Sequence, residues 1–170
     1  LGGVIGITNT HSVGVVRDAL VAHAARENEG QGVFWSLPVV GETYDGALND
    51  INGFHVQRSH VDAALAAAAR GPVAEGGVGG GTGMICHEFK GGIGTASRRL
   101  PDGDGGWTVG ALVQANFGRR EQLMVAGVPV GREVGCDRVP CRTRPTPQPE
   151  ARDGSIIIVV ATDAPLMPHQ

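Results

Sequence analysis

The feature that most constrains the fold is an unbroken apolar run at 156–161 (IIIVVA), which directly follows the pair Gly154-Ser155. A run of this length is typical of a strand, and the lack of alternating polar residues predicts a strand buried on both faces. Two strand-like segments precede it, at 93–100 and 107–116, and the Pro-, Asp- and Gly-rich turn between them predicts a hairpin. An all-helical fold is therefore excluded.

Two segments have helical spacing. After the polar run at 8–12 (TNTHS), apolar residues recur every three or four positions, which predicts a capped helix that ends near 27–30. A second, Ala-rich helix is expected over 61–70, capped by Ser59 and stopped by Gly71-Pro72. Together with the strands, these helices predict an α+β or layered α/β sandwich.

The other segments carry weaker patterns. The stretch at 32–41 (GVFWSLPVVG) is β-prone but contains Pro38, and 122–130 suggests another pair of short strands. The segment 132–152 is rich in Pro and Arg and has no periodicity, so we expect an exposed loop.

Composition and charge exclude several classes of protein. The 170 residues are within the range of one domain, and 28 of them are glycine without a collagen-like period. Fourteen Lys and Arg against seventeen Asp and Glu give a net charge of −3, which argues against a nucleic-acid partner. No apolar run approaches the ~20 residues of a membrane span. Three cysteines are an odd and low count for a disulfide framework.

The glycine-dense segment 76–83 (GGVGGGTG) does not match a phosphate-binding loop. It has no Gly-x-Gly-x-x-Gly register, no Gly-Lys-Ser/Thr follows it, and it comes after a helix rather than a strand. We interpret these glycines as positions where the backbone passes close to other backbone or to a ligand.

Potential metal ligands also lack the spacing of a metal site. The candidates are Cys86-His87-Glu88, the pair Cys136 and Cys141, and the pair His55 and His60. The first group is contiguous, the second has no partnering histidines, and the third has the wrong spacing for one helical face. We therefore expect no metal and no cofactor.

The junction Gly154-Ser155 suits a different chemistry. Glycine leaves the preceding carbonyl sterically open, so the Ser155 hydroxyl can attack it and cut the chain. The freed α-amine, with an ordinary pKa of about 7.7–8.0, can then act as general base for its own hydroxyl. This is the arrangement of an N-terminal-nucleophile hydrolase, although a Gly-Ser pair before a strand is commonplace by itself.

Six ordered stretches resemble the DmpA-type aminopeptidases, the family of L-aminopeptidase/D-amino-acid esterase-amidases and β-peptidyl aminopeptidases. The stretches cover nearly the whole chain at sensible spacings, and together they are specific. They are 5–14 (IGITNTHSVG), 38–46 (PVVGETYDG), 79–86 (GGGTGMIC), 89–98 (FKGGIGTASR), 113–118 (VQANFG) and 153–165 (DGSIIIVVATDAP).

The resemblance implies an αββα-layered sandwich of the DmpA/ornithine acetyltransferase type, incomplete at both ends in this chain. It also implies a precursor that cuts itself between Gly154 and Ser155, which makes Ser155 the N-terminal nucleophile. Asn116 matches the family's oxyanion-stabilising asparagine. From the residues alone, Asn116 would instead be a strand-end residue that caps a turn before Gly118.

The resemblance further implies the substrate contacts. Glu42 corresponds to the carboxylate that holds the free amino group of the substrate, and Trp35 and Tyr44 match positions that line the pocket. Without the resemblance, Glu42 would be a solvated turn residue and both aromatic residues would belong to the core. The expected substrates are small peptides, amides or esters with a free amino terminus.

The chain departs from the family near its end. The family's remaining catalytic groups, a second serine and a glutamate, lie well downstream of the nucleophile, whereas this chain stops at Gln170. We therefore expect 1–170 to be one partial domain, with 1–154 from the large subunit and 155–170 from the small subunit, and to be inactive alone. The loop at 132–152 is also longer and more basic than the family's usual connection.

Two other functions stay open. Acyl transferases of the ornithine acetyltransferase type share the fold and the self-cleavage but normally use threonine, whereas this chain has Ser155. A non-catalytic relative that binds small amines or peptides would remain uncut. The resemblance also implies a homo-oligomer of processed subunits. We expect a cytoplasmic location, with the periplasm as the alternative because any leader would lie upstream of Leu1.

Overall fold

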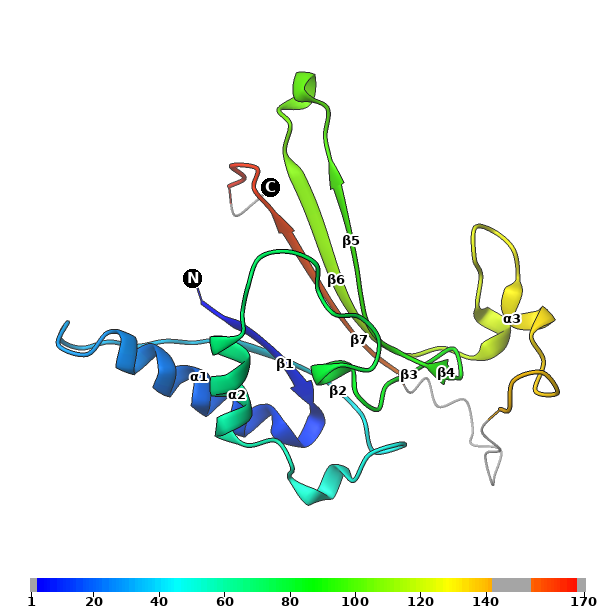
Figure 1. Ribbon diagram of the computed structural model, residues 1–170, viewed down its shortest axis with the longest axis horizontal. Helices are drawn as coiled ribbons and strands as arrows, with labels where there is room; N and C mark the ends of the chain where they lie inside the picture. Colours follow the sequence, from blue (N-terminus) through cyan, green and yellow to red (C-terminus); the bar gives the residue numbers. More distant parts are fainter. Residues whose placement is uncertain (1–2, 142–153, 168–170) are drawn as a thin grey trace.

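The computed structural model describes residues 3–141 and 154–167 (Figure 1). Its helices are α1 (Val13–Glu27), α2 (Arg58–Ala66) and α3 (Val130–Glu133). Its strands are β1 (Ile5–Asn9), β2 (Val39–Thr43), β3 (Ile85–Cys86), β4 (Phe89–Lys90), β5 (Gly92–Arg99), β6 (Thr108–Asn116) and β7 (Ser155–Thr162). The mixture confirms the α+β class.

Helices α1 and α2 pack against a two-stranded parallel sheet. Strands β1 and β2 pair in register from Ile5 with Val39 to Asn9 with Thr43. Apolar side chains of the two helices form the buried core cluster, which consists of Val16, Ala19, Leu20 and Val61, and Val40 of β2 packs against it. The helix face predicted from the three- and four-residue spacing is therefore the face that is buried.

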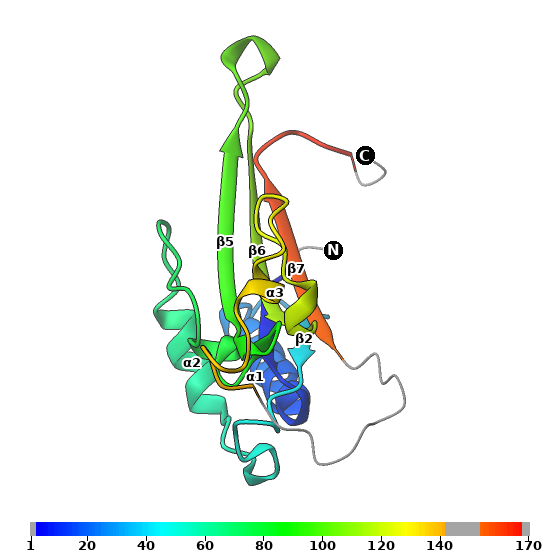
Figure 2. The ribbon, with the colours of Figure 1, turned by 90° about the vertical axis from the view of Figure 1, so that its right-hand side faces the viewer.

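The second sheet is antiparallel, with β6 in the centre between β5 and β7. The β5–β6 hairpin confirms the turn prediction, and its tip extends well beyond the rest of the molecule (Figures 1 and 2). Strand β7 pairs with β6 from Val109 with Thr162 to Asn116 with Ser155. The apolar run at 156–161 is thus a strand, as predicted.

The two sheets meet where β2 crosses β7. A Cβ at Gly41 would lie 2.9 Å from Cδ1 of Ile157, so the glycine lets the two strands approach closely. Because successive strand residues point to opposite faces, Val40 faces the helices while Gly41 faces β7. The helices, the β1–β2 sheet and the β5–β6–β7 sheet therefore follow one another as layers.

A buried polar link joins the same two sheets. Gln114 of β6 is fully buried, and its Nε2 donates to Oγ1 of Thr43 at 2.5 Å. The Thr43 hydroxyl in turn donates to the sulfur of Met84 at 2.8 Å. These two bonds favour one arrangement of the strands, because a shifted strand would leave the buried donors unpaired.

The prediction that β7 is buried on both faces is wrong for the described residues. Ile156, Ile158 and Val160 are about half exposed or more, and Val160 reaches 64%. The reason is that β2 covers the Ile157 face of β7, while no described segment packs on the other face. The apolar run therefore correctly predicted a strand, but it did not show that only one face of this strand is buried.

The glycine-dense segment lies where backbone passes close to backbone, as the sequence predicts. The amide and carbonyl of Gly76 bond with Ile93 at 2.7 and 2.9 Å. A Cβ at Gly81 would lie within 3.0 Å of the backbone of both residues 92 and 93, and one at Gly80 would lie 3.1 Å from the carbonyl oxygen of Ile7. Because these glycines lack a Cβ, the backbones can approach closely where the two sheets meet.

Several local predictions are wrong. The stretch 122–130 forms only one bridge, between Val125 and Val128, because a 3-10 turn at Arg120–Gln122 and helix α3 from Val130 bound it on both sides. Strand structure in 32–41 begins only at Val39, after Pro38. Residues 142–153, most of the predicted loop, lie outside the described residues.

Both helix starts also differ from the prediction. Thr10–Ser12 forms a 3-10 turn, and Ser12 makes no capping bond to α1. Ser59 lies inside α2, whose first turn instead has the backbone N–H of Gln57 donating to Nδ1 of His60 at 3.0 Å.

The cysteines also differ from the expectation. Cys136 and Cys141 form a disulfide, while Cys86 is free. The odd, low cysteine count argues against a framework of several disulfides. It does not exclude a single local disulfide between residues five positions apart.

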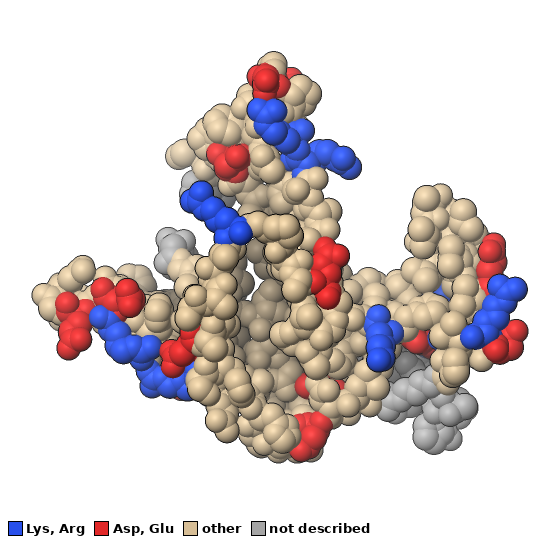
Figure 3. Space-filling view, in the orientation of Figure 1, with Lys and Arg blue, Asp and Glu red and all other residues tan. Residues whose placement is uncertain are grey.

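The surface charges are mixed. Lys and Arg side chains are interspersed with Asp and Glu on the face shown in Figure 3. Over residues 3–141 and 154–167, the structure has no helix with both the length and the apolar character needed to cross a bilayer.

We predict that the close approach at Gly92 is essential for stability. Gly92 has φ +135°, and an added Cβ would overlap the carbonyl oxygen of Gly76. Gly92→Ala should therefore lower the free energy of unfolding by about 2–4 kcal/mol. Gly94→Ala, two residues along the same strand, has open space around its Cβ and should change it by less than about 0.5 kcal/mol. Urea unfolding of the full-length variants measures both, and equal effects would contradict the prediction.

Candidate active site

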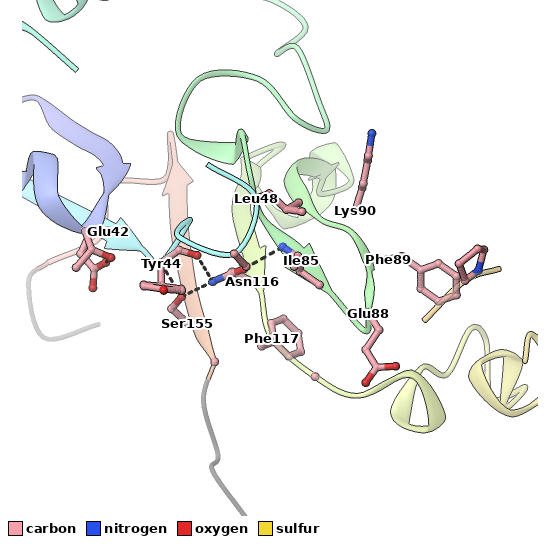
Figure 4. Close-up of a pocket in the computed structure, with 15 residues that line it drawn as sticks. Glu42, Tyr44, Leu48, Ile85, Glu88, Phe89, Lys90, Asn116, Phe117 and Ser155 are labelled. Atoms are coloured by element: carbon pink, nitrogen blue, oxygen red, sulfur yellow. Dashed lines mark hydrogen bonds between the residues drawn. The ribbon is translucent and has the colours of Figure 1, made fainter. Parts of the chain in front are cut away.

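The end of the β6–β7 ladder brings Asn116 and Ser155 together. Asn116 is the last residue of β6, Ser155 is the first of β7, and the two are register partners. Nδ2 of Asn116 donates to Oγ of Ser155 at 3.0 Å (Figure 4). Two candidates that are 39 positions apart in the sequence thus form one hydrogen-bonded pair.

The orientation of the Asn116 amide is fixed from three sides. Its Oδ1 accepts the backbone N–H of Ile85 at 2.9 Å, so Nδ2 must face the other way. Nδ2 also donates to the carbonyl of Tyr44 at 2.8 Å, which leaves its second hydrogen for Ser155. An amide held in this way is a preorganised donor beside the hydroxyl. It is not the turn cap that the residues alone suggested.

Tyr44 contacts Asn116 and Ser155 through its backbone rather than through its ring. Its N–H donates to Oγ of Ser155 at 3.4 Å, which is a long hydrogen bond. The neighbouring Asp45 is buried, and its carboxylate accepts bonds from Asn9 at 3.1 Å and from Asn49 at 2.9 Å. These bonds hold the segment after β2 in place and therefore fix the Tyr44 N–H.

Glu42 lies on β2 at the other side of Ser155. Its Oε2 accepts a hydrogen bond from the hydroxyl of Thr10 at 2.5 Å. The pairing of β1 with β2 brings these residues together, because Thr10 directly follows β1. Within the described residues, Glu42 has no Lys or Arg partner. A carboxylate offers about four acceptor sites, so Glu42 can still bind a cationic group. It lies in a strand, not in the solvated turn of the alternative interpretation.

One cavity of about 920 Å³ is lined by Ser155, Asn116, Tyr44 and Glu42. Thr10, Glu42 and Tyr44 form one end of it, with Asn116 and Ser155 next to them. The other end combines the apolar residues Ile85, Phe89, Phe117 and Pro140 with the charged residues Glu88 and Lys90. Figure 4 shows Ser155 and Asn116 between Glu42 and Phe89. The cavity thus has the Glu42 carboxylate at one end, the Ser155 hydroxyl in the middle and, beyond it, apolar side chains flanked by Glu88 and Lys90.

Gly154 and Ser155 both line this cavity, so the bond between them borders open space. A Cβ at Gly154 would lie 2.9 Å from Cβ of Phe117, which means that only glycine lets the chain enter β7 at this point without a shift. The Gly154–Ser155 bond and the Ser155 hydroxyl therefore border the same cavity.

Trp35 is not brought to the cavity. It lies between α1 and β2, its exposed fraction is 72%, and it is not among the lining residues. The alternative interpretation of both aromatic residues as core is wrong, because Tyr44 is also 54% exposed.

Sequence reasoning missed the groups that act through the backbone or through a neighbour. The N–H of Ile85 and the N–H of Tyr44 carry no sequence signal, because any residue supplies an amide. Thr10 had a signal, since it belongs to the polar run at 8–12, but that run was interpreted as a helix cap. The described residues contain no cluster of three or more His, Cys, Asp or Glu, and the expectation of no metal remains a prediction.

Cys86 is close to the site but is not suited to be its nucleophile. Burial raises the pKa of the Cys86 thiol above its ordinary value, and a backbone hydrogen bond involving Phe117 opposes part of this shift. A raised pKa lowers the thiolate fraction, and the thiolate is the reactive form. Cys86 is also not among the residues that line the cavity, whereas Ser155 is, so Ser155 is the better candidate.

Comparison with known proteins identifies the family. Peptidase family S58 matches residues 1–170. The chain belongs to this family. It is 56% identical over 175 residues to the beta-peptidyl aminopeptidase BapA of Sphingosinicella microcystinivorans, and the match covers 99% of the chain and 43% of that relative. The chain thus spans less than half the length of this relative.

Solved structures agree with this membership. A beta-aminopeptidase of a Burkholderia species has a TM-score of 0.84 and 63% identity, over 99% of the chain and 44% of that protein. The L-aminopeptidase D-Ala-esterase/amidase of Ochrobactrum anthropi has a TM-score of 0.80 and 50% identity, over 96% of the chain and 43% of that protein. That structure is described as a prototype serine aminopeptidase with a variant of the Ntn hydrolase fold. The predicted DmpA-type fold is confirmed.

We predict that alkylation of Cys86 depends on pH in the way that a raised pKa requires. In the folded full-length protein, the pH midpoint of its reaction with iodoacetamide should lie above the midpoint for the same thiol in urea, because less thiolate forms at a given pH. Peptide mapping by mass spectrometry identifies the site, and Cys136 and Cys141 should stay unmodified without reductant. Slower reaction with an unchanged midpoint would indicate steric shielding instead.

Proposed function

We propose that this chain is part of a self-processing serine aminopeptidase that cuts itself between Gly154 and Ser155. The observation that carries the proposal is the Ser155 hydroxyl, 3.0 Å from the fixed amide of Asn116 and inside a cavity that Glu42 also lines. The S58 family membership supports the same activity.

In the self-cleavage step, Oγ of Ser155 attacks the carbonyl carbon of Gly154. The C–N bond breaks, the amino group of Ser155 takes up a proton, and Gly154 is left as an ester on the hydroxyl. Water then hydrolyses this ester. The step frees both the nucleophilic hydroxyl and the α-amine on the same residue.

In substrate hydrolysis, the freed α-amine of Ser155, or a group near it, accepts the proton as Oγ attacks the substrate carbonyl. The Asn116 Nδ2–H and the Tyr44 N–H both point to Oγ of Ser155, and we assign them as the donors to the oxyanion that develops beside it. A fixed donor at such a place lowers the activation free energy by about 3 kcal/mol. Water then releases the acyl group from Ser155.

Glu42 supports a preference for substrates with a free amino terminus. Its carboxylate accepts only the Thr10 hydroxyl within the described residues, so it can pair with a substrate ammonium. An acylated amino terminus would leave this carboxylate desolvated and unpaired, which disfavours such substrates. We infer small peptides, amides or esters as substrates, in keeping with the names of the relatives.

The alternatives have less support. An acyl transferase of the ornithine acetyltransferase type is disfavoured, because the matched relatives are aminopeptidases and the candidate nucleophile is Ser155. A homo-oligomer of processed subunits stays a proposal. So does the cytoplasmic location, and the Cys136–Cys141 disulfide favours the periplasmic alternative, because disulfides persist mainly in oxidising compartments.

We predict that Ser155→Ala abolishes both self-cleavage and hydrolysis in the full-length protein. The variant lacks the attacking oxygen, so a denaturing gel should show one uncut chain and the assay no hydrolysis above background. Ser97→Ala, at an exposed serine of β5, should give the same two bands as the unaltered protein. Intact mass spectrometry locates the cut. Two bands from Ser155→Ala, or an uncut and unaltered protein, would overturn the proposed function.

We predict that Glu42→Gln mainly affects substrates with a free amine. Loss of the carboxylate should lower kcat/KM for an aminoacyl p-nitroanilide by roughly 30-fold or more, because the substrate ammonium loses its paired charge. The N-acetylated analogue should react equally slowly with both proteins. Glu27→Gln, at the exposed end of α1, serves as the control. An equal loss on free and acetylated substrates would contradict the role of Glu42.

A further inference from the structure

Arg120 is a buried cation that the proposed chemistry does not use. Its exposed fraction is 4%, and within the described residues it has no carboxylate partner. Its guanidinium instead donates to backbone carbonyls, at 2.5 Å to Val139 and at 3.2 Å to Glu88. Its Cζ also lies 4.3 Å from the centre of the Phe89 ring. A buried arginine with such partners holds two pieces of backbone together.

The two pieces that Arg120 joins are far apart in the sequence. Glu88 and Phe89 belong to the β3–β4 hairpin, while Val139 lies in the segment 136–141, which the Cys136–Cys141 disulfide closes. We call Arg120, Phe89 and the segment 136–141 the Arg120 clamp. The disulfide limits the shapes that the segment can adopt and therefore presents the Val139 carbonyl to Arg120.

The clamp borders the apolar end of the cavity. Phe89 and Pro140 both line the cavity, together with Phe117, and the charged residues Glu88 and Lys90 line it on either side of Phe89. In Figure 4, Phe89 lies on the far side of Asn116 from Glu42. A substrate whose amino group is at Glu42 and whose carbonyl is at Ser155 directs the group beyond the scissile bond towards this end.

We propose that the Arg120 clamp forms the subsite for apolar or aromatic leaving groups, and that the Cys136–Cys141 disulfide keeps this subsite formed. The proposal rests on the proposed function, which sets the direction of the substrate. An ordered apolar wall favours a bulky leaving group because the wall needs no further ordering when the group binds. A leaving group as small as ammonia does not reach the clamp.

Opening the disulfide tests whether the Arg120 clamp must be ordered, and it leaves the side chains of Phe89, Phe117 and Pro140 in place. A dithiol reductant supplies two electrons and two protons, the Cys136–Cys141 bond breaks to give two thiols, and the reductant closes to a cyclic disulfide. The segment 136–141 then gains freedom and the Arg120–Val139 bond is weakened. Cys136→Ser with Cys141→Ser produces the same open state permanently.

The experiment compares two substrates of the same amino acid in the full-length protein: its p-nitroanilide and its simple amide. For the double serine variant, kcat/KM on the anilide should fall by roughly 2- to 10-fold, while kcat/KM on the amide stays within twofold of the unaltered protein. For each substrate, the variant is compared with the unaltered protein, so the intrinsic difference in reactivity between the two leaving groups cancels. The parameter kcat/KM is suitable because the leaving group is still bound up to acylation.

The reductant provides the matched control. It should shift the unaltered protein and Cys86→Ser towards the values of the double variant, reversibly on reoxidation, and leave the double variant unchanged. An equal loss on both substrates, or no loss on the anilide, would overturn the clamp proposal even with self-cleavage and amide hydrolysis intact. If the unaltered protein neither cuts itself nor hydrolyses the amide, the proposed function fails instead.

Discussion

The register of β6 against β7 is the constraint on which the rest of the site depends. The ladder ends with Asn116 opposite Ser155, and a slip by one residue would turn every side chain of β7 to the other face. The register is well defined because Ile157 packs against Gly41 of β2 on one face. The position of a single hydroxyl is thus set by the pairing of two whole strands, which is more rigid than placement on a loop.

The junction of the two sheets adds the remaining groups. Gln114 and Asn116 lie on the same face of β6 and bond to consecutive residues, the hydroxyl of Thr43 at the end of β2 and the carbonyl of Tyr44 just after it. These two links bring the end of β2, and Glu42 with it, to Ser155. The site is therefore assembled where the sheets meet, and the glycines of 76–83 allow this meeting because no Cβ separates the backbones.

Local patterns predicted the local elements. Apolar spacing found α1, a run of Asp and Gly found the β5–β6 hairpin, and the apolar run found β7. Pairings between distant segments could not be predicted in this way, because the parallel β1–β2 pair and the contact between Arg120 and Val139 depend on how the whole chain folds. The Gly154-Ser155 junction suggested the nucleophile, and the motif resemblance supported Ser155 and supplied Asn116 and Glu42. The amide donors around them needed the structure, since backbone atoms leave no trace in a sequence.

The place of Ser155 within its strand has a consequence for the fate of the two pieces after a cut. A break before the first residue of β7 would leave the rest of the strand hydrogen-bonded along β6, with Ile157 still packed on Gly41. The new chain end would be anchored by many weak contacts instead of one covalent bond. Separation of the halves would then require unfolding, so the cut molecule would persist as a single interlocked body.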